Sequence, residues 1–266
     1  GGTGKTPLVK YIANKLKDLG YKPGIVSRGY GGNYSGTLEV TSESTYKETG
    51  DEAQILAKLN MPFYLDRNRP RAVKNIVDNK DCDVIIADDG LQHYKLGRDL
   101  EIVVLDGARR LGNSLTFPAG PLRESAKRLN SVDFIVNNGG PTNENEHLMT
   151  ISPANFIHLN TSKSYSVDSW PMHKQVHAVA GLGNPGRFFD TLTRLGFDVI
   201  RHPFPDHHKY NRNDLNFLDH LPIIMTEKDA AKCKHFRNTK IWYLTVEADL
   251  PDDFIKQIDQ KLKQLN

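Results

Sequence analysis

Apolar residues along the chain follow two patterns that alternate: short continuous runs and helical spacings. Residues 8–19 carry Leu and Ile at helical spacing, with Pro7 in the first turn and Gly20 as a C-terminal stop. Further helices are expected to open at Gly50 and after the basic stretch 66–71. Because helices alternate with apolar runs and hairpin signals are lacking, the pattern predicts a doubly wound parallel sheet up to about residue 140. The predicted strands of this sheet cover residues 23–27, 37–41, 61–65, 83–88, 101–105 and 132–136.

The second half of the chain begins with a change of pattern. A polar stretch over residues 139–146 predicts a linker, and alternating apolar and polar residues over 149–166 indicate two short antiparallel strands. A second α/β series follows, with strands at 175–180, 197–201, 222–225 and 241–246, and helices up to 195, near 213–218, from 226 and after 251. We therefore expect a doubly wound domain at 1–146, a short two-stranded β linker at 147–174 and a smaller α/β domain at 175–266.

Composition narrows the class of protein. Of the 266 residues 25% are charged, and no apolar run approaches the length of a membrane span, as in a globular protein soluble in water. Cys82 and Cys233 lie far apart without ligand-like neighbours, which argues against a disulfide scaffold or a zinc site and fits a reducing, cytoplasmic setting. The net charge of +3 suits anionic ligands or an anionic membrane surface, gives no case for a nucleic-acid partner, and is also ordinary for a solvated surface.

The first six residues, Gly1-Gly2-Thr3-Gly4-Lys5-Thr6, end in Gly-Lys-Thr and lead directly into the predicted helix. This is the second half of a phosphate-binding P-loop, and it predicts a P-loop NTPase-like domain that binds ATP. In such a loop the backbone of Gly2, Thr3 and Gly4 faces phosphate oxygens, Lys5 pairs with the β/γ-phosphates and Thr6 binds Mg²⁺. The motif's first Gly and its launching strand would lie before residue 1, so we expect that the chain is a fragment lacking its start.

A second motif supports this interpretation. The apolar strand at 83–88 ends in Asp88, Asp89 and Gly90, which would bring carboxylates to the edge of a parallel sheet where such folds bind ligands. In P-loop enzymes a carboxylate in this position holds Mg²⁺. Ordinary turn chemistry explains an Asp-Gly pair alone, but it does not explain a P-loop and a strand-borne Asp in one chain.

Four further segments allow both a structural and a functional interpretation. Asp51 and Glu52 open a helix, where acids are favoured by the helix dipole and could equally act in a site. The Arg123-Glu124 pair after rigid Pro turns is typical of a surface ion pair, with a ligand clamp as the alternative. The turn Asp206-His207-His208 offers proton transfer near neutral pH, a structural His or a metal ligand. The segment 226–229 has the pattern of a capped helix start, which is sufficient to explain it.

One motif match is rejected. Residues 181–186, Gly-Leu-Gly-Asn-Pro-Gly, repeat the string that opens peptidyl-tRNA hydrolases. In those enzymes an Arg-His-Asn run that supplies the catalytic His comes after the string. Here Arg187-Phe188-Phe189 follows instead, so the segment is interpreted as a tight turn into a helix.

Seven short motifs follow one another in order over nearly the whole chain, at residues 1–7, 27–31, 50–53, 88–93, 118–124, 206–208 and 226–230. Together they resemble the tetraacyldisaccharide 4'-kinases of lipid A and lipopolysaccharide biosynthesis. The resemblance implies a transferase that uses ATP and Mg²⁺ to phosphorylate the 4'-hydroxyl of a tetraacylated glucosamine disaccharide 1-phosphate. It further implies that the full-length protein acts at the cytoplasmic face of the bacterial inner membrane, through a hydrophobic N-terminal helix that precedes the P-loop.

The resemblance also implies roles for individual residues. Asp51 would be the base that takes the proton of the sugar hydroxyl, with His207 orienting it as a dyad. Glu52 and Asp88 would join Thr6 at the metal site. Contacts to the substrate, directly or through a neighbour, are expected from Asp89, Gln92, His93, Arg123, Glu124 and Arg28.

Two other functions remain open from the residues alone. A MinD-like P-loop ATPase would use the Gly-Lys-Thr loop to drive protein assembly, but it has no use for Asp206 and His207. A catalytically idle module that binds lipid or protein is the alternative from a different class, because half of the P-loop is absent from the sequence. ATP-dependent transfer of label to the acyl disaccharide would separate all three functions.

Overall fold

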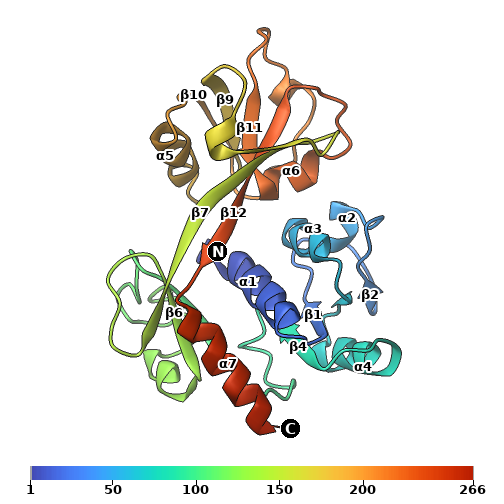
Figure 1. Cartoon of the computed structure of the whole chain (residues 1–266), viewed down its shortest axis with the longest axis vertical. Coiled ribbons are helices and arrows are strands. Elements are labelled where there is room, and N and C mark those ends of the chain that lie inside the picture. The colour runs from blue at the N-terminus through green and yellow to red at the C-terminus, as the bar shows by residue number, and fades with distance from the viewer. Residues whose placement is uncertain (1, 266) are drawn as a thin grey trace.

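The computed structural model describes residues 2–265, so Gly1 of the P-loop motif lies outside the described residues. The chain forms a larger and a smaller lobe, joined by the long strands β7 (Glu146–His158) and β12 (Ile241–Asp249) (Figure 1). These two strands pair antiparallel, with a register shift between Leu244 and Val246. Because both strands run from one lobe into the other, a single hydrogen-bonded ribbon sets the position of the smaller lobe relative to the larger one.

The larger lobe contains a four-stranded sheet of order β2-β3-β1-β4. Strands β3, β1 and β4 are parallel, as predicted, whereas the edge strand β2 is antiparallel and only two residues long. The predicted strand at 37–41 is therefore largely loop. The bounds of these elements are β1 Pro23–Ser27, β2 Leu38–Glu39, β3 Phe63–Leu65 and β4 Val84–Ala87, with helices α1 Lys5–Asp18, α2 Tyr46–Thr49, α3 Asp51–Leu56 and α4 Arg69–Asn79, and a 3-10 turn at Ala57–Leu59.

The second sheet has eight strands and runs through both lobes in the order β10-β9-β11-β12-β7-β6-β5, with β8 added on β7. Strands β5, β6 and the first part of β7 are parallel in the larger lobe, and β9, β10, β11 and β12 are parallel in the smaller lobe. The remaining bounds are β5 Ile102–Asp106, β6 Phe134–Asn138, β8 Ser164–Ser166, β9 Gln175–Ala180, β10 Asp198–Pro203, β11 Ile223–Thr226, α5 Gly186–Arg194, α6 Glu227–Cys233 and α7 Asp252–Leu265, with 3-10 turns at Ala126–Ser131, Val167–Ser169 and Asn213–Leu215.

The C-terminal helix α7 packs on the larger lobe. Phe254, Ile255 and Ile258 share a core with the buried face of α1, and the Tyr21 hydroxyl donates a hydrogen bond to Asp259 at 2.8 Å. The predicted ranges 1–146, 147–174 and 175–266 placed this helix with the smaller α/β unit. These domain boundaries stay predictions. The helix α7 differs from them, because it packs on the larger lobe and not on the smaller one.

Most predicted elements are present, with four differences besides the strand predicted at 37–41. The two short strands expected at 149–166 are one strand of 13 residues, β7, and the short β8. The helix expected near 213–218 is a single 3-10 turn, and the helix α2 was not predicted. Leu19, placed on the apolar face of α1, is half exposed because it follows the last helical residue. Among residues 2–265, the helices are all too short or too polar to cross a bilayer.

Candidate active site

The N-terminus of α1 has the properties of an anion site. Gly4 is its N-cap residue and adopts a left-handed conformation, φ 96°, without a side chain that could cap the helix. A Cβ atom on Gly4 would lie 2.8 Å from the Asn138 amide nitrogen, so only glycine fits there. The same amide donates a hydrogen bond to the Thr3 carbonyl at 3.0 Å. The first N–H groups of α1 are therefore directed at a position suited to phosphate oxygens.

Lys5 and Asp89 connect this loop to the end of β4. The Lys5 ammonium lies 3.6 Å from Asp89, and both carboxylate oxygens of Asp89 accept hydrogen bonds from the Arg123 guanidinium at 3.1 Å. Burial raises the pKa of Asp89, but Lys5 and Arg123 outweigh it and hold that pKa below its ordinary value. Asp89 also has a left-handed backbone, φ 49°, which is uncommon outside glycine. The predicted residues Lys5, Asp89 and Arg123 thus form one charged group.

A cavity of about 160 Å³ lies beside this group. Asp88, at the end of β4, and Glu52, in the first turn of α3, both contribute carboxylates to its lining. Burial, together with the neighbouring Glu52 and Asp89, raises the pKa of Asp88 to about 6. Carboxylates that repel one another in a buried site are stabilised by a cation. The complete lining comprises Ser27, Arg28, Gly29, Tyr30, Glu52, Ala53, Asp88, Asp89 and Arg123.

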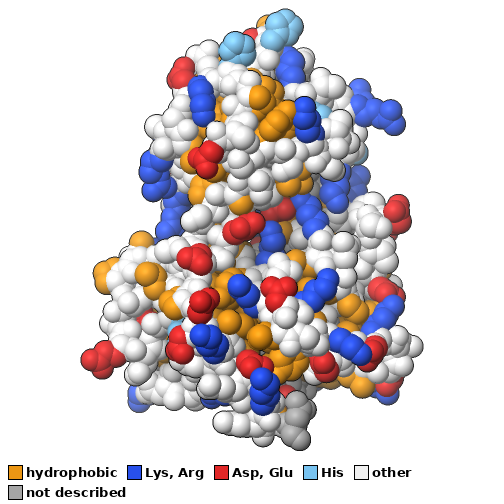
Figure 2. Space-filling model, in the orientation of Figure 1, with side chains coloured by type: hydrophobic (Ala, Val, Ile, Leu, Met, Phe, Trp, Pro, Cys, Tyr) orange, Lys and Arg blue, Asp and Glu red, His pale blue; other side chains and the backbone are white. Residues whose placement is uncertain are grey.

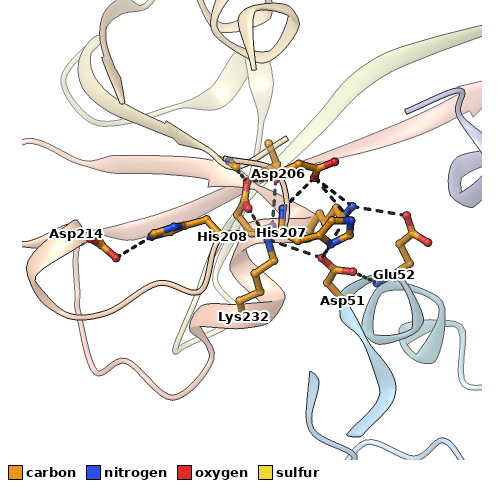
Figure 3. A network of polar contacts seen from close by, with 11 residues as sticks. Asp51, Glu52, Asp206, His207, His208, Asp214 and Lys232 are labelled. Atoms are coloured by element: carbon orange, nitrogen blue, oxygen red, sulfur yellow. Dashed lines mark hydrogen bonds and ion pairs between the residues drawn. The ribbon is translucent and has the colours of Figure 1, made fainter. Parts of the chain in front are cut away.

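Asp51 and His207 meet across the two lobes (Figure 3). The Asp51 Oδ2 atom, at the start of α3, lies 3.4 Å from the His207 Nδ1 atom, in the loop after β10. Asp51 is 5% exposed. His207 has a left-handed backbone, φ 59°, and such strain is typical of functional sites. The neighbouring His208 turns away and pairs with Asp214 at 3.0 Å, so the two histidines do not form a metal site together.

Two lysines of α6, Lys228 and Lys232, also approach Asp51, and the sequence analysis missed both. Their ammonium groups lie 3.9 Å and 3.7 Å from the Asp51 carboxylate. The Thr226 side chain does accept a hydrogen bond from the Asp229 N–H, so the predicted helix cap is present. The helix cap alone explained the segment 226–229, so an approach of lysines of this helix to Asp51 was not expected from the sequence. Two signals were available: the motif at 226–230, which contains Lys228, and the four-residue spacing of the lysines, which places them on one face of a helix.

The remaining predicted contact residues form a chain beside Asp89. Gln92 accepts a hydrogen bond from Arg123 at 3.2 Å and donates one to Glu124 at 2.6 Å. Hydrogen bonds from Tyr94 and from Gln92 lower the pKa of Glu124, against the effect of burial. The structure therefore connects Arg123 and Glu124 through Gln92.

Other predicted residues lie less centrally. His93 has a buried Nε2 atom without a hydrogen-bond partner among the described residues, and burial lowers the pKa of His93. Arg28 lines the cavity with Glu52 and Asp88. Thr6 lies in the first turn of α1, outside the lining of the cavity. Among residues 2–265, groups of three or more His, Cys, Asp and Glu side chains that could hold a metal ion are not found.

Comparison with known proteins agrees with this geometry. A family model, LpxK, described as tetraacyldisaccharide-1-P 4'-kinase, matches residues 1–263. The chain belongs to this family. The kinase class predicted from the seven motifs, a phosphotransferase of lipid A biosynthesis, is confirmed.

Individual members of the LpxK family cover nearly the whole chain. A tetraacyldisaccharide 4'-kinase of Ruthia magnifica subsp. Calyptogena magnifica is 47% identical, over 98% of this chain and 83% of the relative. One from Coxiella burnetii is 50% identical, over 96% of this chain and 75% of the relative. A crystal structure of LpxK from Aquifex aeolicus in complex with ATP has a TM-score of 0.81 and 27% identity, over 98% of this chain and 85% of that one. The predicted α/β fold is thereby confirmed.

Proposed function

We propose that this chain transfers the γ-phosphoryl group of ATP to the 4'-hydroxyl of a tetraacylated glucosamine disaccharide 1-phosphate. The observation that supports this proposal best is the contact of 3.4 Å between Asp51 and His207, which joins the two lobes next to Glu52 of the cavity. A buried carboxylate with a His partner is suited to accept the proton of an alcohol. The A. aeolicus relative was crystallised with ATP, which supports ATP as the phosphoryl donor.

Each group of the site has a role in this reaction. The N-terminus of α1 and Lys5 bind the phosphates of the nucleotide and orient the γ-phosphorus. Asp51 accepts the proton of the 4'-hydroxyl while the sugar oxygen bonds to the γ-phosphorus and the bond to the β–γ bridging oxygen breaks. His207 holds the Asp51 carboxylate in the orientation that points it at the hydroxyl. Arg123 and Lys5 keep Asp89 ionised beside the phosphates.

The donor set fits a magnesium ion. Glu52 and Asp88 supply carboxylate oxygens to one cavity, and burial, together with the charges of Glu52 and Asp89, raises the pKa of Asp88 to about 6. Oxygen ligands of this kind are those that Mg²⁺ prefers, and it is usually held by one or two carboxylates together with substrate phosphates. The Thr6 hydroxyl, in the first turn of α1 and outside the lining of this cavity, would be a further ligand by the family resemblance. Bound there, the ion would neutralise charge on the phosphoryl oxygens.

The acceptor is a lipid, and one loop of the larger lobe is suited to a membrane surface. Between β5 and the 3-10 turn at Ala126–Ser131, Phe117 is 82% and Leu115 is 51% exposed. Arg123, in the same loop, lines the cavity. Exposed apolar side chains near cations are typical of segments that insert at an anionic interface. This loop supports contact with a membrane surface, which for the lipid acceptor we propose to be the cytoplasmic face of the inner membrane.

The proposal is tested by incubating the chain with γ-labelled ATP, Mg²⁺ and the acylated disaccharide 1-phosphate, and following label into lipid. We expect label in the disaccharide at the 4'-position, and its loss in Asp51→Ala. ATP hydrolysis without labelled lipid would favour a MinD-like ATPase instead, and ATP left intact would favour a binding module. Either result with the folded protein would contradict the proposal.

A further inference from the structure

Lys228 has an unusual place among the charged groups of the site. Its ammonium nitrogen lies 3.9 Å from Asp51 Oδ2, 3.7 Å from Glu52 Oε1 and 3.8 Å from Asp206 Oδ1. Charge-assisted hydrogen bonds between an ammonium and a carboxylate are typically about 2.7–2.9 Å long. Lys228 is thus held between three carboxylates from both lobes and is tightly bound to none of these three.

Lys232, one turn further along α6, is held by a direct hydrogen bond, unlike Lys228. It donates a hydrogen bond at 3.0 Å to Asp229, which is fully buried. Asp229 also accepts hydrogen bonds from the Gly181 N–H at 3.0 Å and from the Thr226 hydroxyl at 2.7 Å. Removing Lys232 would leave a buried carboxylate without its cation, so this lysine stabilises the smaller lobe. The side chain of Lys228 is 18% exposed and has no such partner among the contacts described.

The position of Lys228 coincides with the path of the reaction. Asp51 and Glu52 are neighbours in the first turn of α3, where Glu52 lines the cavity with Asp88 and Asp51 faces His207. In the proposed reaction the phosphoryl group moves from the P-loop side to a hydroxyl held at Asp51, so it comes close to both carboxylates. Both would repel it, and among residues 2–265 Lys228 is the cation that lies within 4 Å of both.

We propose that Lys228 is a catalytic residue that leaves its carboxylates and binds the transferring phosphoryl group. This inference rests on the proposed kinase function and assigns a further residue to it. Negative charge on the equatorial oxygens of the transition state is best stabilised by a cation that is already in place. Because α6 belongs to the smaller lobe, the contact between the lobes supplies this charge together with His207. Figure 2 shows acidic and basic side chains gathered where the lobes meet.

The test compares Lys228→Met with the wild-type chain by three measurements: kcat, the Kd of MgATP, and the Kd of MgADP with aluminium fluoride in the presence of acceptor. Aluminium fluoride mimics the phosphoryl group in the transition state. We expect kcat and the affinity for the mimic each to fall by about 100-fold or more, while the affinity for MgATP changes by less than about 3-fold. Lys228→Arg, which keeps the charge, should recover part of both losses.

Lys234→Met is the matched control. Lys234 also lies just after α6 and bonds across the lobes, to Gln54 at 2.7 Å, but it is not among the cations that contact Asp51. Its kcat should stay near that of the wild-type chain. The inference is overturned if an active wild-type chain loses no kcat in Lys228→Met, if the mimic and MgATP weaken equally, or if Lys234→Met loses as much. An inactive wild-type chain would instead refute the proposed function.

Discussion

The His207 Nδ1 atom lies 3.4 Å from Asp51 Oδ2, and this contact brings together two residues from opposite lobes. If the pair acts as base and orienting partner, Asp51→Ala and His207→Ala should each lower kcat by about 100-fold or more. The Kd of ATP should change little, because the phosphates are bound at α1. Steady-state kinetics with a separate ATP-binding assay checks this. His208→Ala is the control, since His208 pairs with Asp214 away from Asp51, and a loss equal to that of His207→Ala would refute the assignment.

Gly4→Ala should damage nucleotide binding through the backbone. A Cβ atom there would lie 2.8 Å from both Asn138 Nδ2 and Met149 Cε, and φ is 96°. We expect the loop to shift and the affinity for ATP to fall by about 10-fold or more, since the N–H groups then miss the phosphate oxygens. Gly20→Ala is the matched control, because Gly20 also has a positive φ but open space around it. Unchanged ATP affinity in Gly4→Ala, measured by calorimetry, would contradict the P-loop assignment.

The pKa of Asp88 gives a prediction with a defined sign. It rises from 3.8 to about 6 on folding, so the folded chain binds more protons than the unfolded chain between these pH values. Without divalent cations, this group therefore lowers stability as pH rises from 3.8 to about 6. Asp88→Asn should raise the Tm at pH about 7.5 without Mg²⁺ and should abolish most of the rise in Tm that Mg²⁺ gives to the wild-type chain. A Tm that is lower in both conditions would refute this account.

Glu146, the first residue of β7, changes the stability of the fold with pH in the opposite direction to Asp88. Hydrogen bonds from Arg110, at 2.7 Å and 2.6 Å, lower the pKa of Glu146 from 4.5 to about 2. A depressed pKa stabilises the fold above the unfolded value, and that contribution is lost as pH falls from 4.5 towards 2. Glu146→Gln should lower the free energy of unfolding at neutral pH by about 1–2 kcal/mol. Chemical denaturation at neutral pH and at acidic pH should show the difference between variant and wild type shrinking on acidification.

Membrane contact is tested by the exposed loop before Arg123. Replacing both Phe117 and Leu115 by Ser should weaken sedimentation of the chain with anionic phospholipid vesicles by about 10-fold, since two apolar side chains no longer enter the interface. Leu218→Ser is the control, because Leu218 is 99% exposed but belongs to the smaller lobe. Equal vesicle binding by all three proteins would rule out this loop as the membrane contact.

The sequence allowed the elements and the P-loop residues to be predicted because both depend on local spacing. The strand Pro23–Ser27 and the helix behind Gly4 follow from apolar runs and a helical repeat, and both are present. The helix expected near 213–218 failed because its apolar residues fit a helical face, whereas Asn211 and Asp214 hold a tight turn there.

The parts that could not be predicted depend on contacts between distant segments. Lys228 and Lys232 reach Asp51 only because β7 and β12 place α6 over α3. The burial of Arg69 also could not be predicted from the sequence. This residue belongs to the basic stretch 66–71, yet it is 2% exposed and donates hydrogen bonds to the carbonyls of Asp66 and Asp88. Local pattern carries little information on which charged side chains of a basic segment become buried.

In the proposed mechanism Asp51 and His207 act as one unit, and a double-mutant cycle tests this most directly. The kcat of phosphoryl transfer is measured for the wild-type chain, for Asp51→Ala, for His207→Ala and for the chain with both changes. Residues that act through one another are not additive. We predict that the double variant is no slower than Asp51→Ala alone. A double variant whose loss is the product of the two single losses would show that the residues act independently, and would contradict the account.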